Sequence, residues 1–340
     1  MKIRCLAVLL LSVAAFRTAA AEVRLNSSTP ERYEVMPGDT LWEIAGRFLV
    51  NPWEWPAVWR RNPHVINPDL IYPGDVLQLD RAGGQAMVRV SQPSETRLSP
   101  RIRIDPTPPA IPTIRMAAIR PFLSTPSVLT EEERSTTPDV VGLDEGRILG
   151  GENDLIYVRS IRTAVPDSYT VFRAGQPYTD ADTGELLGYE GLYVADAQLR
   201  STGEPATLQL LRSEREVRIG DRVLPMRPEP TGLYVQPHVT SRRMRGHIIS
   251  VLEGVNEIGQ YNIVALDRGS RDGIEVGHVF DIRQQGKEIR EIYSSFGSKV
   301  FSPEQPAGSL MVFRVFKRVS YALVLQATRA IHVLDIIQTP

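Results

Sequence analysis

The sequence has a single cysteine among its 340 residues, and that cysteine lies at position 5. The rest of the chain therefore has no disulfide framework and no thiol nucleophile, which excludes papain-like endopeptidase chemistry. Histidine is scarce too, since there are five, with no HExxH or HxH pair, and His238, His247, His278 and His332 are well separated along the chain. This spacing is not that of a zinc peptidase, so we expect no metal site.

Long hydrophobic runs are also missing. The apolar stretch Cys5–Phe16 has 12 residues, whereas a membrane-spanning helix needs roughly 20. It follows two basic residues and precedes Ala19–Ala21, which is the order of charge, apolar run and small residues of a secretory signal peptide. We therefore expect residues 1–21 to be removed on export to the periplasm, with a mature chain that begins near Glu22.

The chain lacks an excess of charge of either sign. Its formal net charge is −1, and removal of residues 1–21, which hold three basic and no acidic residues, would make it −4. Nucleic-acid binding relies on a surplus of Lys and Arg facing phosphates, so no polyanionic partner is expected. The remaining length is enough for two or three domains.

Aromatic residues, by contrast, are concentrated near the N-terminus. All four tryptophans lie between Trp42 and Trp59, which marks residues 33–80 as a small aromatic-rich unit. Trp55 and Trp59 are spaced by four residues and are predicted to lie in its core, because so small a unit needs large buried side chains. Trp53 is predicted to be the most exposed of the four.

The order of elements in this unit is predicted to be βααβ. A strand at 33–35 leads through a Pro-Gly turn into a helix capped by Asp39 or Thr40. A second helix follows, and a second Pro-Gly turn leads into a strand at 76–79 that can pair with the first. Two helices on a two-stranded sheet are therefore expected.

This unit resembles the LysM domain, through V-x-x-GDTLW-x-IA from Val35 and NPD-x-I-x-PGD-x-L-x-L from Asn67. The resemblance implies binding of N-acetylglucosamine-containing glycans, chiefly peptidoglycan, in a groove between two loops. The implied contacts are Gly38, Asp39, Thr40 and Leu41 on one wall, and Asn67, Asp69, Leu70, Ile71, Pro73 and Gly74 on the other. Leu70 and Ile71 are expected to pack on the apolar faces of the sugar. Asp39 and Thr40 have helix capping as an alternative role.

The segment Arg81–Pro112 contains six prolines and few large apolar residues, which predicts an extended linker. Beyond it, a helix is predicted over Met116–Leu123, and a second helix opens at Thr130, with Glu133 in the capping-box position. From Gly142 onward the sequence is strand-rich. The predicted strands are Leu155–Ile161, Tyr169–Arg173, Gly191–Arg200, Ala206–Leu211, Ile248–Glu253, Tyr261–Leu266 and Gly308–Val315.

A pattern of strands recurs three times in this region. Each pass has a glycine, a strand, a second strand about 15 residues on, and a closing turn of the form V/I-G-D/H. The passes begin at Gly191, Gly308 and Gly246. We predict a small β-barrel or paired β-barrels over residues 113–340, and hence an α+β chain of LysM module, linker and mainly-β region.

Wall-binding modules often accompany hydrolases, so catalytic motifs in the β-rich region would be informative. No SxxK or G-x-S-x-G motif occurs, and a strand-rich region does not suit a lysozyme-like domain. The acidic loop Asp267–Gly273 lacks EF-hand spacing and is predicted to be a turn. No enzyme activity and no cofactor are therefore expected. The alternative is a cell-wall remodelling hydrolase with an unrecognised active site.

The order of signal peptide, LysM module, linker and β-rich region resembles the secretin-associated LysM proteins of type IV pili, the TsaP family, with a FlgT-like C-terminal region. The segments that carry the resemblance are GRILGGENDLIYVRS from Gly146, DTGELLGYEG from Asp182, GDRVLP from Gly220 and LDRGSRDGIEVGHVF from Leu266. The resemblance implies a non-enzymatic anchor that ties an outer-membrane secretin to peptidoglycan near the outer membrane. Assembly into a ring of like subunits is left open.

Overall fold

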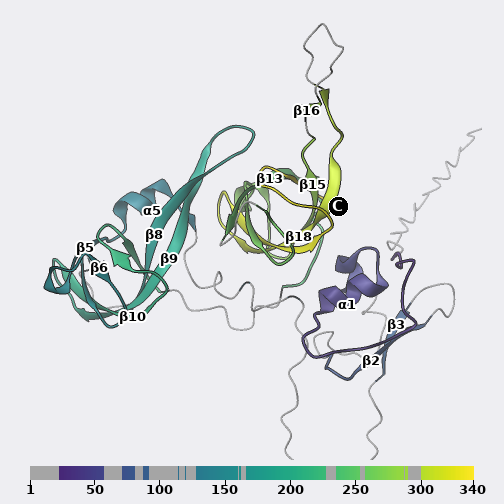
Figure 1. Cartoon of the computed structure of the whole chain (residues 1–340), viewed down its shortest axis with the longest axis horizontal. Helices are drawn as coiled ribbons and strands as arrows, with labels where there is room; N and C mark the ends of the chain where they lie inside the picture. The colour runs from purple at the N-terminus through teal and green to yellow at the C-terminus, as the bar shows by residue number, and fades with distance from the viewer. Residues whose placement is uncertain are drawn as a thin grey trace, which may run out of the picture.

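The computed structural model describes residues 23–56, 71–80, 87–91, 114, 119, 128–159, 161, 166–226, 235–252, 257–286, 288–289 and 300–340. Four of our predictions lie largely or wholly outside these ranges: the signal peptide, the second LysM helix, the linker over Arg81–Pro112 and the helix over Met116–Leu123. The described residues form an N-terminal α/β module and two bodies built from β-strands (Figure 1). Among them, no helix combines the length and the apolar character needed to cross a membrane.

The N-terminal module has a three-stranded antiparallel sheet in the order β1-β2-β3. Its elements are β1 (Arg32–Glu34), α1 (Leu41–Phe48), η1 (Pro52–Glu54), β2 (Val76–Asp80) and β3 (Met87–Ser91). Strand β3 lies within the segment predicted as linker, so that prediction is wrong for these five residues. The alternating sequence MVRVS covers the edge of β2 that β1 leaves free, and Val90 packs against the module core.

Helix α1 begins after Thr40, because side chains there can form hydrogen bonds with backbone amides at the start of the helix. The side chain of Thr40 accepts a hydrogen bond from the Glu43 amide at 3.2 Å, and the Glu43 carboxylate accepts one from the Thr40 amide at 3.1 Å. This capping box confirms one of the two predicted caps. The apolar face of the helix packs with Trp55, which is fully buried in the module core as predicted.

Barrel A follows. It is a sheet in the order β12-β8-β9-β10-β7-β5, with β4 also paired to β9. Its elements are β4 (Val128–Leu129), α5 (Glu131–Thr136), β5 (Val140–Leu143), η3 (Asp144–Gly146), β6 (Leu149–Gly150), β7 (Leu155–Val158), β8 (Ser168–Thr179), β9 (Leu186–Ser201), β10 (Ala206–Ser213), β11 (Val217–Arg218) and β12 (Arg222–Pro225). The Asp139–Arg222 bridge joins the two ends of the sheet, so it curls back on itself. The capping box predicted for Thr130 and Glu133 is confirmed at α5.

Barrel B is a closed six-stranded barrel in the order β13-β14-β19-β18-β15-β20. Its elements are β13 (Arg245–Leu252), β14 (Ile263–Leu266), η4 (Ser270–Asp272), β15 (Val279–Gln284), β16 (Glu288–Ile289), β17 (Val300–Phe301), β18 (Gln305–Val315), β19 (Ser320–Ala327) and β20 (Ile336–Gln338). Strands β16 and β17 form a separate ribbon that extends the β15–β18 hairpin (Figure 1). The prediction of barrel architecture in this region is confirmed.

The two barrels share one topology. Barrel B consists of two three-stranded units, β13-β14-β15 and β18-β19-β20. If each strand of one unit is exchanged for the corresponding strand of the other, every pair of neighbouring strands is still a pair of neighbours. Barrel A has the same order with β5-β7-β8 and β9-β10-β12 as its two units. The three predicted passes correspond to three of these units. The sequence pattern missed the fourth, β5-β7-β8, which has no V/I-G-D/H turn before its third strand within the described residues.

One type of four-residue turn recurs before many of these strands. Its third residue has positive φ, and its fourth side chain accepts a hydrogen bond from the amide of its first residue. In the described residues this turn occurs at 36–39, 72–75, 151–154, 218–221, 259–262, 275–278 and 332–335. The residue at the third position is Gly in four of these turns and Asn, Tyr or Leu in the others.

Part of the wall of barrel B is buried on both faces. The interior is filled by one set of alternate side chains from all six strands, such as Val264 and Val324. Outward-facing residues, chiefly of β14, β18 and β19, such as Ile263 and Leu323, are also buried and pack with residues from outside the barrel. The covering residues include Trp42 of the N-terminal module. Both faces of β14 and β19 are therefore apolar, which explains their continuous hydrophobic sequences.

The long hairpin β8–β9 of barrel A supplies another part of this cover, because it extends well past the other strands of its own barrel (Figure 1). Tyr178 and Leu187 near its tip pack against the outer wall of barrel B. Ion pairs surround this contact, with Arg268 2.9 Å from Asp180 and Arg271 3.1 Å from Glu185. The acidic loop at 267–273, predicted to be a turn, contains the short 3-10 helix η4, and its arginines hold the hairpin tip.

Candidate glycan-binding site

Two copies of the recurring turn lie side by side on the N-terminal module. Their sequences are Met36-Pro-Gly-Asp39 and Tyr72-Pro-Gly-Asp75. Proline in the second position and glycine in the third are the residues that a type II turn favours, and Gly38 and Gly74 have φ of +94° and +98°. Each aspartate accepts a hydrogen bond from the amide three residues before it, at 2.8 and 2.9 Å.

Backbone hydrogen bonds hold the two turns together. The Gly74 amide donates to the Val35 carbonyl at 2.8 Å, and the Val35 amide donates to the Asp75 carbonyl at 2.9 Å. A Cβ atom built on Gly38 or Gly74 would meet no other atom within 4 Å, so the space above both glycines is open. The pair of turns therefore presents an accessible backbone surface that a ligand can approach.

The first wall of the expected groove contains Asp39, which is half-buried. Besides the Met36 amide, its carboxylate accepts a hydrogen bond from the Tyr33 hydroxyl at 2.8 Å. Burial, followed by this hydrogen bond to Asp39, raises the pKa of Tyr33 above its ordinary value. The guanidinium of Arg47 lies 4.8 Å from the centre of the Tyr33 ring. Asp39 is therefore held rigidly in one orientation, with its turn.

Several residues that the LysM resemblance implied as contacts are core residues of the module instead. Leu41 and Ile71 are 2% and 0% exposed, and Thr40 is 3% exposed with its hydroxyl used in the capping box. The expectation that Ile71 packs on the sugar is wrong for this structure, because its side chain fills the space under the two turns. Asn67, Asp69 and Leu70 lie outside the described residues.

The accessible residues of the two turns are Met36, Pro37, Gly38, Tyr72, Pro73 and Gly74. Gly38, Pro73 and Gly74 were expected in the groove, whereas Met36, Pro37 and Tyr72 were not. Met36 is 56% exposed, although methionine is usually buried. The repeated x-Pro-Gly-Asp motif could have pointed to Met36, Pro37 and Tyr72, because it predicts two similar turns with these residues in their first two positions.

The described tryptophans divide between the module core and its contact with barrel B. Trp55 belongs to the core, while Trp42, at 5% exposed, packs with the outer wall of barrel B. Trp53 is the most exposed of the three, as predicted, but is half-buried, with its ring centre 6.4 Å from that of Trp42. Trp59 lies outside the described residues.

The structure also brings together two of the histidines that looked well separated. The rings of His238 and His278 are 4.8 Å apart, and Glu275 lies beside them. His278 is the last residue of the turn at 275–278, and its Nδ1 accepts a hydrogen bond from the Glu275 amide at 3.1 Å. While this hydrogen bond is made, Nδ1 of His278 is not available to a metal ion. His278 thus takes the place that aspartate has in five of the other turns and asparagine in the turn at 259–262.

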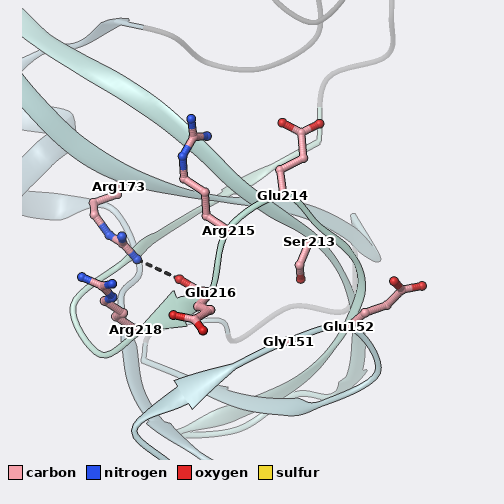
Figure 2. A pocket seen from close by; sticks show the side chains of 8 residues that line it. All are labelled: Gly151, Glu152, Arg173, Ser213, Glu214, Arg215, Glu216 and Arg218. Carbon is pink, nitrogen blue, oxygen red and sulfur yellow. Dashed lines mark hydrogen bonds between the residues drawn. The ribbon is translucent and has the colours of Figure 1, made fainter. Parts of the chain in front are cut away.

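A shallow cavity of about 560 Å³ on barrel A is lined by charged side chains of both signs (Figure 2). Arg173 makes two hydrogen bonds to Asp221, at 2.8 and 2.9 Å, and donates a third to the Glu216 carbonyl at 2.9 Å. The Asp221 carboxylate closes the turn at 218–221 as well. This arginine therefore fastens β8 to that turn, which is a structural role.

Comparison with known proteins identifies the module. Residues 33–80 match the model of the LysM domain. LysM domains bind N-acetylglucosamine-containing glycans of peptidoglycan, so the chain carries a carbohydrate-binding domain that is associated with cell walls and is not catalytic. None of the curated proteins compared with the chain matches it.

Proposed function

We propose that the chain is an exported, non-enzymatic scaffold that binds peptidoglycan through its LysM domain and a protein assembly through its barrels. The assembly we propose is an outer-membrane secretin of the type IV pilus. The proposal is supported by the open surface of the paired x-Pro-Gly-Asp turns, together with the match to the LysM domain. The accessible backbone groups of the two turns suit the acetamido groups of a glycan.

The two barrels support the part of the proposal that concerns a protein partner. Barrel B is covered on its outer wall by other parts of this chain, whereas the outer wall of barrel A carries polar side chains such as Gln198, Arg200 and Gln209. The polar outer wall of barrel A can therefore take up a second protein while the LysM domain binds the glycan. Nothing in the comparisons points to a hydrolase.

Glycan binding is tested by sedimentation of the full chain with insoluble peptidoglycan. Replacing Asp39 with alanine should weaken binding about tenfold, because the turn loses the carboxylate that holds it. The matched control is Asp154→Ala, which removes the equivalent carboxylate from the turn at 151–154 in barrel A. Equal binding by the two variants, or no sedimentation of the unaltered chain, contradicts the proposed site.

The partner and the absence of catalysis are tested separately. Affinity purification from crosslinked cells should recover the secretin with the full chain, and removal of barrel A should abolish this recovery. In a peptidoglycan-containing gel the protein should produce no cleared band. A cleared band would favour the hydrolase alternative, and normal piliation in cells that lack the protein would contradict the anchoring role.

A further inference from the structure

The LysM domain and barrel B meet at the start of α1. Trp42, the second residue of this helix, is buried against outward-facing residues of barrel B rather than in the core of its own domain. The next residue, Glu43, accepts a hydrogen bond from the hydroxyl of Tyr261 in barrel B. The contact therefore lies directly beside Thr40 and the first turn of the glycan site.

Tyr261 occupies a backbone position that disfavours it. It is the third residue of the turn at 259–262, with φ of +68°. A side chain in this left-handed region is crowded, and glycine or asparagine is usual there. The equivalent turn of barrel A, at 151–154, has Asn153 with φ of +70° in the same place. The rest of the turn is alike, since Gly259 and Asn262 make the bond that Gly151 and Asp154 make.

The side chain of Tyr261 has a role that asparagine could not perform. Its ring packs against the apolar contact between the LysM domain and barrel B, and its hydroxyl reaches one oxygen of the Glu43 carboxylate. The other oxygen accepts the hydrogen bond from the Thr40 amide at 3.1 Å. One carboxylate thus connects the barrel to the residue that follows the first x-Pro-Gly-Asp turn.

We propose that Tyr261 is a positioning residue of the glycan site, so that barrel B and the LysM domain bind an N-acetylglucosamine oligosaccharide as a unit. Tyr261 holds Glu43 in one rotamer, which keeps the capping box closed and the adjoining turn ordered before the glycan arrives. Less order then has to be imposed on binding, and the affinity rises. By linkage, bound glycan strengthens the contact between domain and barrel. This inference rests on the glycan binding proposed above.

The test uses the full chain and a tetramer of N-acetylglucosamine, with the dissociation constant measured by calorimetry. Tyr261→Phe keeps the ring and removes the hydroxyl, and it should weaken binding by about three- to tenfold. Tyr261→Asn copies the residue of barrel A, so the turn is retained, and it should weaken binding at least as much. Tyr157→Phe is the matched control, because the Tyr157 hydroxyl also donates to a carboxylate, that of Asp144 at 3.1 Å, in barrel A. Its affinity should equal that of the unaltered chain.

A second measurement reports positioning directly. In the absence of glycan, hydrogen exchange of the amides of residues 39–44 should be faster in Tyr261→Phe than in the unaltered chain, and unchanged in Tyr157→Phe. Unchanged affinity and exchange in Tyr261→Phe would overturn the role of Tyr261 and leave the glycan site itself standing, provided that Asp39→Ala binds weakly. Failure of the unaltered chain to bind the tetramer or peptidoglycan would overturn both proposals.

Discussion

Barrels A and B have the same strand order, yet their equivalent strands differ in what they present to the outside. In barrel A, Gln209 of β10 faces Leu155 of β7, and in barrel B, Leu323 of β19 faces Ile263 of β14. Strand β10 alternates between buried and partly exposed residues over its first five positions, whereas the first six residues of β19 are all buried. The strand order is thus the same whether the outward-facing residues are polar or apolar. These outward-facing residues decide whether other parts of the chain cover the barrel.

The largest effect is expected where the cover of barrel B is removed. Trp42→Ala should shift the LysM domain toward the undocked state by about 3–5 kcal/mol, because a buried indole is lost from the contact. Small-angle scattering should show a larger radius of gyration while the domain stays folded. Trp55→Ala is the companion change, and it should unfold the domain itself because Trp55 lies in its core. An unchanged radius for Trp42→Ala would mean that the contact does not hold the domain.

Exchanging residues between the equivalent strands tests the comparison itself. Leu323→Gln should lower the free energy of unfolding by about 2–4 kcal/mol, since a polar amide would replace a fully buried side chain at a covered wall. Gln209→Leu should change the free energy of unfolding by less than about 1 kcal/mol, because Gln209 lies at the surface, where it accepts a hydrogen bond from Arg200. Chemical denaturation measures both. Similar losses in the two variants would contradict the assignment of one free wall and one covered wall.

The turn at 275–278 in barrel B predicts a dependence of stability on pH near neutrality, because its last residue is a histidine. Burial, and then the nearby His238, lowers the pKa of His278 below its ordinary value of 6.5. The folded state therefore binds this proton less readily than the unfolded state, so the stability is present above pH 6.5 and is lost as the pH falls from there toward the lowered pKa. Glu275, the other charged group beside it, has a smaller and opposite effect on that pKa.

Asparagine at position 278 should remove this dependence. It keeps a neutral acceptor for the Glu275 amide, as Asn262 does in the turn at 259–262, and it does not titrate. Thermal unfolding of His278→Asn between pH 7.5 and 5 should therefore show a shallower decline than that of the unaltered chain, with a modest loss at neutral pH from the smaller side chain. His332→Asn serves as control, because its ring is half-exposed. Parallel declines in all three proteins would rule out His278 as the cause.

The smallest effect concerns the third position of another turn of barrel B, at 332–335. Leu334 has φ of +74° and is half-exposed, so its side chain gains little from burial and is crowded by the backbone. Leu334→Asn should therefore stabilise barrel B by about 0.5–1 kcal/mol. Asn153→Leu, the reverse change in barrel A, should destabilise by a similar amount. Denaturant midpoints measure both, and a loss of stability in Leu334→Asn would indicate a contact that Leu334 makes in an assembly.

Local patterns identified most of the strands, the capping box at Thr130 and, as one of two alternatives, the Thr40 cap of α1. The motif x-Pro-Gly-Asp specifies a turn through proline, a left-handed glycine and a carboxylate within four residues, so the turns of the LysM domain could be predicted from sequence. The position of Ile71 could not. A β-branched apolar residue next to a binding loop can pack either on a sugar ring or in the domain core. Only the packing under the two turns shows which of these two roles Ile71 has.

The sequence by itself determined the local elements of this protein: the LysM signature, the recurring turn and the alternation of most strands. Each depends on interactions within a few residues, where side-chain chemistry leaves few choices. The tertiary structure decided which faces meet. Trp42 and Trp55 are both buried tryptophans in one small domain, but one faces the barrel and the other its own core. That difference depends on contacts between residues more than 200 positions apart, such as Glu43 and Tyr261, which no local pattern contains.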